Sequence, residues 1–152
     1  IYIDPFLAGL EHPVPPAISA MAVLVHECRH AVLSHRVPEM FRVRVKAEAL
    51  KERAPQAVFD ITLSLLTVDE SLAESVERLF LDRLAKTPAT GGLLERAAEI
   101  AAPLLTSDEG VDKLRRAAAL ALRALEAVEK GDMEEAQLLI EELEMFSRLA
   151  SS

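Results

Sequence analysis

Apolar side chains recur every three or four positions along most of this sequence, which is the spacing of an amphipathic α-helix. Two such stripes follow one another near the end of the chain: Leu114, Ala118, Ala121, Leu122 and Leu125, then Ala136, Leu139, Ile140, Leu143 and Phe146. Gly131 between them is typical of a helix C-terminus, and Asp132 with Glu135 is a capping box that starts the next helix. The pattern predicts a tight antiparallel helical hairpin.

Proline, glycine and capping residues divide the rest of the chain. Six helices are expected. The fifth starts at a cap at Ser107-Asp108 and ends near residue 130, and the sixth begins after Asp132. The four helices before the fifth are expected over 16–35, 39–53, 56–85 and 93–105. The run 87–92 is expected to be a loop. Ile1-Tyr2-Ile3 is the one strand-like piece, and Asp4-Pro5 ends it. We therefore predict an all-α fold, or nearly so, in which the first helix packs against the long third helix.

The chain length favours one domain. Its 152 residues are 51% hydrophobic and 28% charged, which is typical of a globular chain that buries a core. We expect a single domain over 1–152, with a metal-site core in 1–86. The region 91–152, which contains the helical hairpin, is expected to pack on that core. The alternative role of the hairpin is a docking surface for a protein partner or a lid.

Charge and composition limit the partners. A net charge of -8 argues against nucleic acid or an anionic membrane as the main partner. No apolar run approaches the ~20 residues of a membrane span, and no secretory signal is visible. Cys28 is the single cysteine, so an internal disulfide framework is excluded. We expect Cys28 to be a small buried apolar residue and the protein to be cytoplasmic.

The segment His26-Glu27-Cys28-Arg29-His30 carries the chemistry. It reads HExxH within an apolar helical run, and residues four apart lie on one helix face. His26 and His30 can thus present two imidazoles to one ion, with Glu27 near enough to act as general base on a bound water. The plainer interpretation is a pair of histidines that are hydrogen-bonded in a helix core. A buried His-Glu-His cluster without a partner would be costly, which favours a metal.

A catalytic zinc ion usually has three protein ligands. His35 is nine residues beyond His26, about 180° round the helix, and is poorly placed. Asp69 and Glu70 are better candidates because they stand in an apolar stretch of the third helix, where an acid requires a partner. Their alternative partners are Arg42 and Arg44, or water at the rim of the core. Residues Arg42, Arg44, Lys46 and Arg53 are also expected to pair with the acidic run 141–144.

The HExxH motif, followed tens of residues later by Glu70-x-x-Ala73-Glu74, resembles the gluzincin pattern of zinc metallopeptidases. The resemblance implies that Glu70 is the third ligand. Gluzincins commonly have aspartate where Glu74 stands, so this position departs from the pattern. The HExxHxxGxxH pattern of metzincins is absent.

The N-terminal third has a second resemblance. Ile1 to Phe6, the HExxH helix and the sequence Leu33-Ser34-His35-Arg36 are similar to metallopeptidase domains that accompany von Willebrand A-like domains. That group tends to use a downstream aspartate, which would favour Asp69 or Asp60 as the ligand. Neither resemblance covers residues 91–152.

Two functions of different classes follow. The first is a zinc-dependent hydrolase, a small peptidase acting on a peptide or protein, with Glu27 as general base and His26, His30 and Glu70 (or Asp69) as ligands of Zn²⁺. The second is a non-enzymatic helical interaction module with a structural or vestigial metal site. Zincin peptidases bind extended substrates along an edge strand, and this chain is expected to have at most one short strand.

Overall fold

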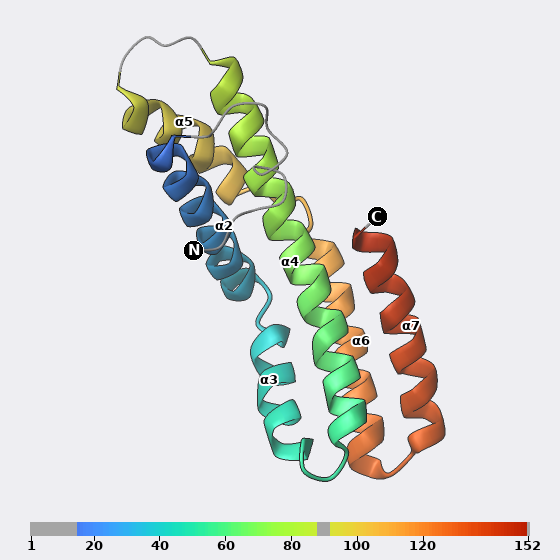
Figure 1. The fold of residues 1–152 in the computed structure, drawn as a ribbon. Coiled ribbons are helices and arrows are strands. Elements are labelled where there is room, and N and C mark those ends of the chain that lie inside the picture. Colours follow the sequence, from blue (N-terminus) through green and yellow to red (C-terminus); the bar gives the residue numbers. More distant parts are fainter. Residues whose placement is uncertain (1–14, 88–91, 152) are drawn as a thin grey trace. The chain divides into compact units, whose positions relative to one another are not determined.

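The computed structural model describes residues 15–87 and 92–151, and every regular element in them is an α-helix. The helices of these described residues are α2 (Pro16–Arg36), α3 (Glu39–Leu50), α4 (Pro55–Lys86), α5 (Leu93–Leu105), α6 (Val111–Lys130) and α7 (Met133–Ser151) (Figure 1). The predicted all-α class and the six helices are confirmed. The strand expected at residues 1–3 and most of the loop expected at 87–92 lie outside the described residues.

Two helix ends differ from the prediction. Helix α3 ends at Leu50 rather than at residue 53, because the amides of Arg53 and Ala54 both turn back to the Leu50 carbonyl. Helix α6 begins at Val111 rather than after a cap at Ser107-Asp108. Its N-cap is Gly110 in the left-handed conformation, with φ of 84°. A Cβ on Gly110 would lie 2.6 Å from Cδ2 of Leu72, so this position requires glycine for two reasons.

The predicted junction between α6 and α7 is confirmed. Gly131 has a φ of 81° and donates to the Val128 carbonyl, while Asp132 donates to the Ala127 carbonyl. These two bonds form a Schellman motif. The side chain of Asp132 then accepts a hydrogen bond from the amide of Glu135 at 3.1 Å, as an N-cap does.

The chain divides into two compact units, each built from two separate segments. One comprises the described residues of Ile1–Arg29 and Ala73–Ser107. In it, the first part of α2 packs with the last part of α4 and with α5, around Ala22, Val25, Val76, Phe80, Leu81, Leu84, Ala97 and Leu104. The expected packing of the HExxH helix on the long third helix is therefore present in this unit.

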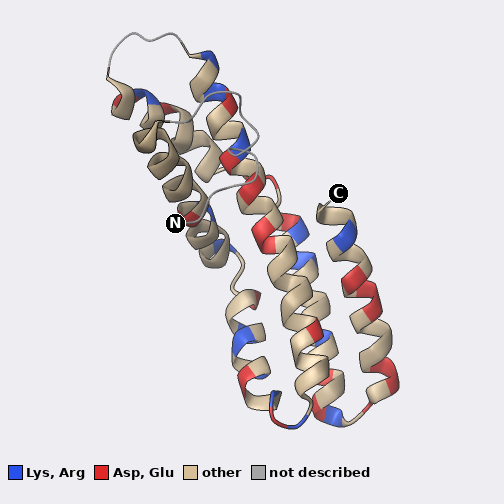
Figure 2. Cartoon of the chain, in the orientation of Figure 1, with Lys and Arg blue, Asp and Glu red and all other residues tan. Residues whose placement is uncertain are grey.

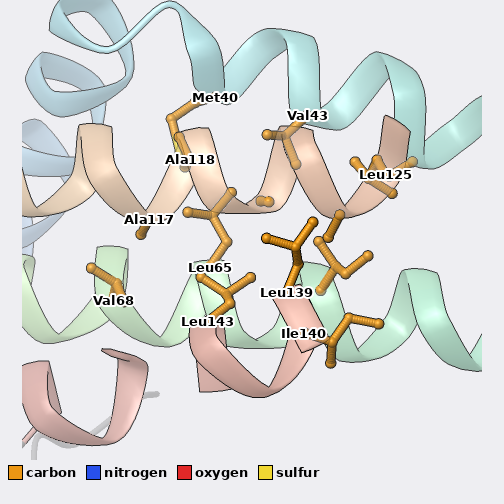
Figure 3. Close-up of a cluster of buried hydrophobic side chains, with 14 of the residues drawn as sticks. Met40, Val43, Leu65, Val68, Ala117, Ala118, Leu125, Leu139, Ile140 and Leu143 are labelled. Atoms are coloured by element: carbon orange, nitrogen blue, oxygen red, sulfur yellow. The ribbon is translucent and has the colours of Figure 1, made fainter. Parts of the chain in front are cut away.

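The other unit comprises His30–Leu72 and the described residues of Asp108–Ser152. Helices α3, α6, α7 and the first part of α4 form a bundle in which α6 packs against both α3 and α7 (Figure 1). Figure 3 shows the core of this bundle, to which α4, α6 and α7 contribute the buried side chains of Leu65, Leu125 and Leu143. The single-domain boundary stays a prediction. None of the helices in the described ranges has the length and hydropathy needed to cross a lipid bilayer.

Candidate metal centre

The residues of the HExxH segment lie on two faces of α2. Ala22, Val25, His26 and Arg29 are buried, which is the i, i+3, i+4, i+7 spacing of a core-facing helix stripe. Glu27 lies on the opposite, exposed face. The motif therefore orients its first histidine toward the protein interior and its glutamate toward solvent.

His26 is held by an acid of α4. Its Nδ1 lies 2.9 Å from Oε1 of Glu77, within hydrogen-bond distance, and both side chains are buried. When the Glu77 carboxylate is ionised it can only accept, and Nδ1 is then the donor. The lone pair of the neutral ring then resides on Nε2, the nitrogen that a metal ion would use.

His30 lies between two neighbouring acids of α4. Its Nδ1 is 3.1 Å from Oδ1 of Asp69, and its Nε2 donates a hydrogen bond to Oε2 of Glu70 at 3.0 Å. Asp69 is nearly buried, whereas the Glu70 side chain is 48% exposed. The Asp69 carboxylate beside Nδ1 raises the pKa of His30 to about 9; burial opposes this rise and Glu70 adds to it.

Each histidine thus presents Nδ1 to a carboxylate of α4, His26 to Glu77 and His30 to Asp69. Carboxylates in this position orient metal-binding histidines in many zinc sites. His26 precedes His30 by one turn of the same helix, and Glu70 lies on Nε2 of His30. His26, His30 and Glu70 form a group that could hold a metal ion. Asp69 contacts the opposite nitrogen of His30.

The other predicted site residues lie as follows. His35 is exposed near the end of α2, and Cys28 is half-buried with a free thiol. Asp60 accepts a hydrogen bond from Gln56, four residues earlier on the same helix. Glu74 lies 4.0 Å from Arg78 on α4. Arg42 and Arg44 were the alternative partners for the acids of α4, but Asp69 and Glu70 contact His30 instead.

Sequence reasoning missed two buried polar residues. Glu77 is 2% exposed and Arg29 is 1% exposed, and Arg29 donates to the Leu105 carbonyl at 2.7 Å. A signal for both was present. Arg29 is seven residues after the buried Ala22, and Glu77 is four residues after Ala73 and three before Phe80, both of which are buried, so each occupies a core-facing helix position.

Comparison with protein families, with curated proteins and with solved structures found no match to this chain.

Proposed function

We propose that this chain binds one divalent metal ion through His26, His30 and Glu70 and acts as a zinc-dependent hydrolase. The observation that carries the proposal is that each of the two histidines contacts a carboxylate of α4 through its Nδ1. Nδ1 of His26 is on Glu77 and Nδ1 of His30 is on Asp69, so Nε2 is the nitrogen on the metal side of each ring. On His30 that nitrogen now contacts Glu70, and an ion would take the place of the proton between them.

The donor set supports zinc. Two imidazoles and a carboxylate are nitrogen and oxygen ligands that suit Zn²⁺. Two ligands of one tetrahedral zinc ion stand ~3.3 Å apart, given bond lengths of about 2.0–2.1 Å. Nε2 of His30 and Oε2 of Glu70 are 3.0 Å apart, so a small separation of the two side chains would admit an ion. Asp69 would then orient His30 from its other nitrogen.

The proposal that the site is catalytic rests on Glu27. It follows His26 by about 100° round the helix and precedes His30 by three positions, the relation it has in HExxH hydrolases. Its exposure leaves the carboxylate accessible to water and to a substrate. A zinc ion at this site would supply Lewis-acid activation of water and of a scissile carbonyl. Glu27 would accept the proton of that water and pass it to the leaving amine.

The gluzincin-like spacing of His26, His30 and Glu70 supports a peptidase as the class of hydrolase. Glu74 departs from the aspartate that is common in that clan. The acid that contacts His26 in this chain is Glu77, three residues further along α4. The site proposed here therefore uses a different α4 position to orient the first histidine.

The metal is tested by elemental analysis of protein purified without added metal. We expect about one zinc per chain in the wild type, and loss of that zinc in His26→Ala and His30→Ala. His35→Ala is the matched control, because His35 lies on the same helix but is exposed and outside the proposed ligand set. Equal metal content in all four proteins, or none in the wild type, would contradict the metal site.

The hydrolase is tested with Glu27→Gln, in which the side chain keeps its shape and loses its basicity. We expect this variant to retain zinc and the wild-type stability, while turnover of a peptide library falls by at least ~10²-fold. Turnover that is the same in the two zinc-loaded proteins would overturn the role of Glu27.

One observation favours a second candidate, a helical interaction module with a structural metal site. Within residues 15–87 and 92–151 there is no strand, so an extended peptide finds no sheet edge there to pair with. This candidate predicts that zinc binds with full stoichiometry, that no library peptide is cleaved, and that the free energy of unfolding falls when zinc is removed.

A further inference from the structure

Exposed apolar side chains form rows on two helices of the unit comprising residues 30–72 and 108–152. Each of these side chains is more than half exposed: Phe59, Leu63 and Leu66 on α4, and Leu138, Met145 and Leu149 on α7. Their spacings, i, i+4, i+7 and i, i+7, i+11, place each set on one side of its helix. Single exposed apolar residues are ordinary, but rows of them mark interaction surfaces.

The row on α4 borders a groove between α3 and α4. The groove has a volume of about 290 Å³, and Leu66 belongs both to its edge and to the exposed row. Its apolar wall consists of Met40, Val43, Ala47, Val58, Leu65 and Leu66. Arg44 and Lys51 line its α3 side, with Glu48 between them. Lys51 is ion-paired with Glu48 at 2.6 Å. The α3–α4 groove is thus apolar inside, and its α3 rim carries two cations and one anion, with Arg44 outside that ion pair.

The two surfaces carry opposite charge. The segment 39–53 has five basic and three acidic residues, although the whole chain has a net charge of -8. Helix α7 has five glutamates and one arginine. Glu134, Glu141 and Glu142 are exposed beside the row that begins at Leu138. Figure 2 shows basic residues on α3 and acidic residues along α7.

The basic residues of α3 do not pair with α7 of the same chain. Lys46 is 3.3 Å from Glu129 of α6, and Arg53 donates to the carbonyl of Glu129. The pairing expected with the acidic run 141–144 is therefore replaced by one with α6. Within the part of the chain that the structure describes, Arg42 and Arg44 make no ion pair.

We propose that α7 of one copy docks in the α3–α4 groove of a second copy. The row from Leu138 to Leu149 spans 12 residues of helix, ~17 Å from the first to the last, and the α4 side of the groove covers 58–66, ~12 Å. The apolar row lies in the apolar groove, and the glutamates beside it face the rim on which Arg44 is the cation without an ion pair among the described residues. A groove-to-groove dimer would instead bring two basic rims together, and an α7-to-α7 dimer would oppose two sets of glutamates.

This contact joins two different surfaces, so it is heterologous. Every copy carries both surfaces, so each copy can bind two others. Assemblies therefore grow larger as the protein concentration rises, unless the copies close into a ring. One helix in one groove buries less than the ~1,200 Å² of a standard interface, so the association is weak and depends on concentration. The charged rims make it weaken as salt is added.

The experiment is sedimentation velocity of the wild type and two variants over a range of concentrations. Leu66→Glu places an acid at the groove, and Leu138→Ser with Met145→Ser removes the row on α7. All three side chains are more than half exposed, so the fold is expected to survive, which circular dichroism checks. Leu94→Glu, at a 72% exposed position of α5, is the matched control and should associate like the wild type.

We expect each interface variant alone to be monomeric at concentrations where the wild type associates. An equimolar mixture of the two interface variants should form a 1:1 pair, in which the intact α7 row of the Leu66→Glu protein docks in the intact groove of the other variant. No larger assembly should form, because the remaining groove and the remaining row of that pair are both altered. A wild type that is monomeric throughout would overturn the proposal. A mixture of the two interface variants that stays monomeric would also overturn it. A single interface variant that still associates with itself would overturn it too, because that result would indicate a symmetric contact through its intact surface.

Discussion

At the residue scale, His30 is the group whose ionisation the fold changes most clearly. Its ring lies between Asp69 and Glu70, with one nitrogen facing each carboxylate. Both nitrogens can donate at once only when the ring is an imidazolium. The fold without metal therefore favours the protonated ring, and this is what raises its pKa from 6.5 to about 9.

The stability of the metal-free protein should depend on pH through this residue. Since the pKa of His30 is higher in the folded state, its stabilisation is fully present below pH 6.5 and is lost as the pH rises through about 9. We expect the free energy of unfolding in urea with a chelator to fall over that range by on the order of 1 kcal/mol, after allowing for solvent screening. His30→Gln lacks the titrating group, and its stability should fall less. Parallel curves for the two proteins would contradict the assignment.

At the element scale, glycine determines where α6 begins and ends. Gly110 and Gly131 have φ of 84° and 81°, values that cost an L-residue roughly 1–2 kcal/mol. Their surroundings differ, because a Cβ at Gly110 meets Leu72 and a Cβ at Gly131 meets nothing within 4 Å. The two positions form a natural pair for separating backbone strain from steric overlap.

We expect Gly131→Ala to lower the free energy of unfolding by about 1–2 kcal/mol, from backbone strain alone. Gly110→Ala should cost about 1 kcal/mol more, because Leu72 must also leave its rotamer. Urea denaturation of both variants measures the difference. Equal losses would mean that Leu72 moves aside at no cost.

At the scale of the whole molecule, the two units have cores of different size. The core of the unit containing His30–Leu72 draws on α2, α3, α4, α6 and α7, with Leu114, Leu125 and Leu143 fully buried. The other core is smaller and centres on Phe80. Most of the apolar burial that stabilises the chain therefore lies in the larger core.

Leu125→Ala, in the middle of the larger core, should lower the free energy of unfolding by about 2–5 kcal/mol through lost burial and a cavity. Leu94→Ala makes the same chemical change at a 72% exposed position and should stay within about 0.5 kcal/mol of the wild type. Thermal or urea unfolding compares the two. A small loss for Leu125→Ala would indicate that the core closes around the missing side chain.

The sequence alone was sufficient for most features that depend on neighbours a few positions apart. The helical class, the α6–α7 turn with Gly131 and Asp132, and the placement of His26 and His30 one turn apart follow from local periodicity and capping, because helix geometry relates each residue to those three and four positions away. The pair Asp69 and Glu70 was found for the same reason, as acids in an apolar stretch.

Only the tertiary structure decided which of those groups meet. Glu77 pairs with His26 across 51 positions, and Glu70 with His30 across 40, distances at which periodicity carries no information. The start of α6 at Gly110 beside Leu72 and the pairing of Lys46 with Glu129 rather than with 141–144 have the same origin. Each depends on how helices pack, and a side chain's partner is selected by the whole core rather than by its own helix.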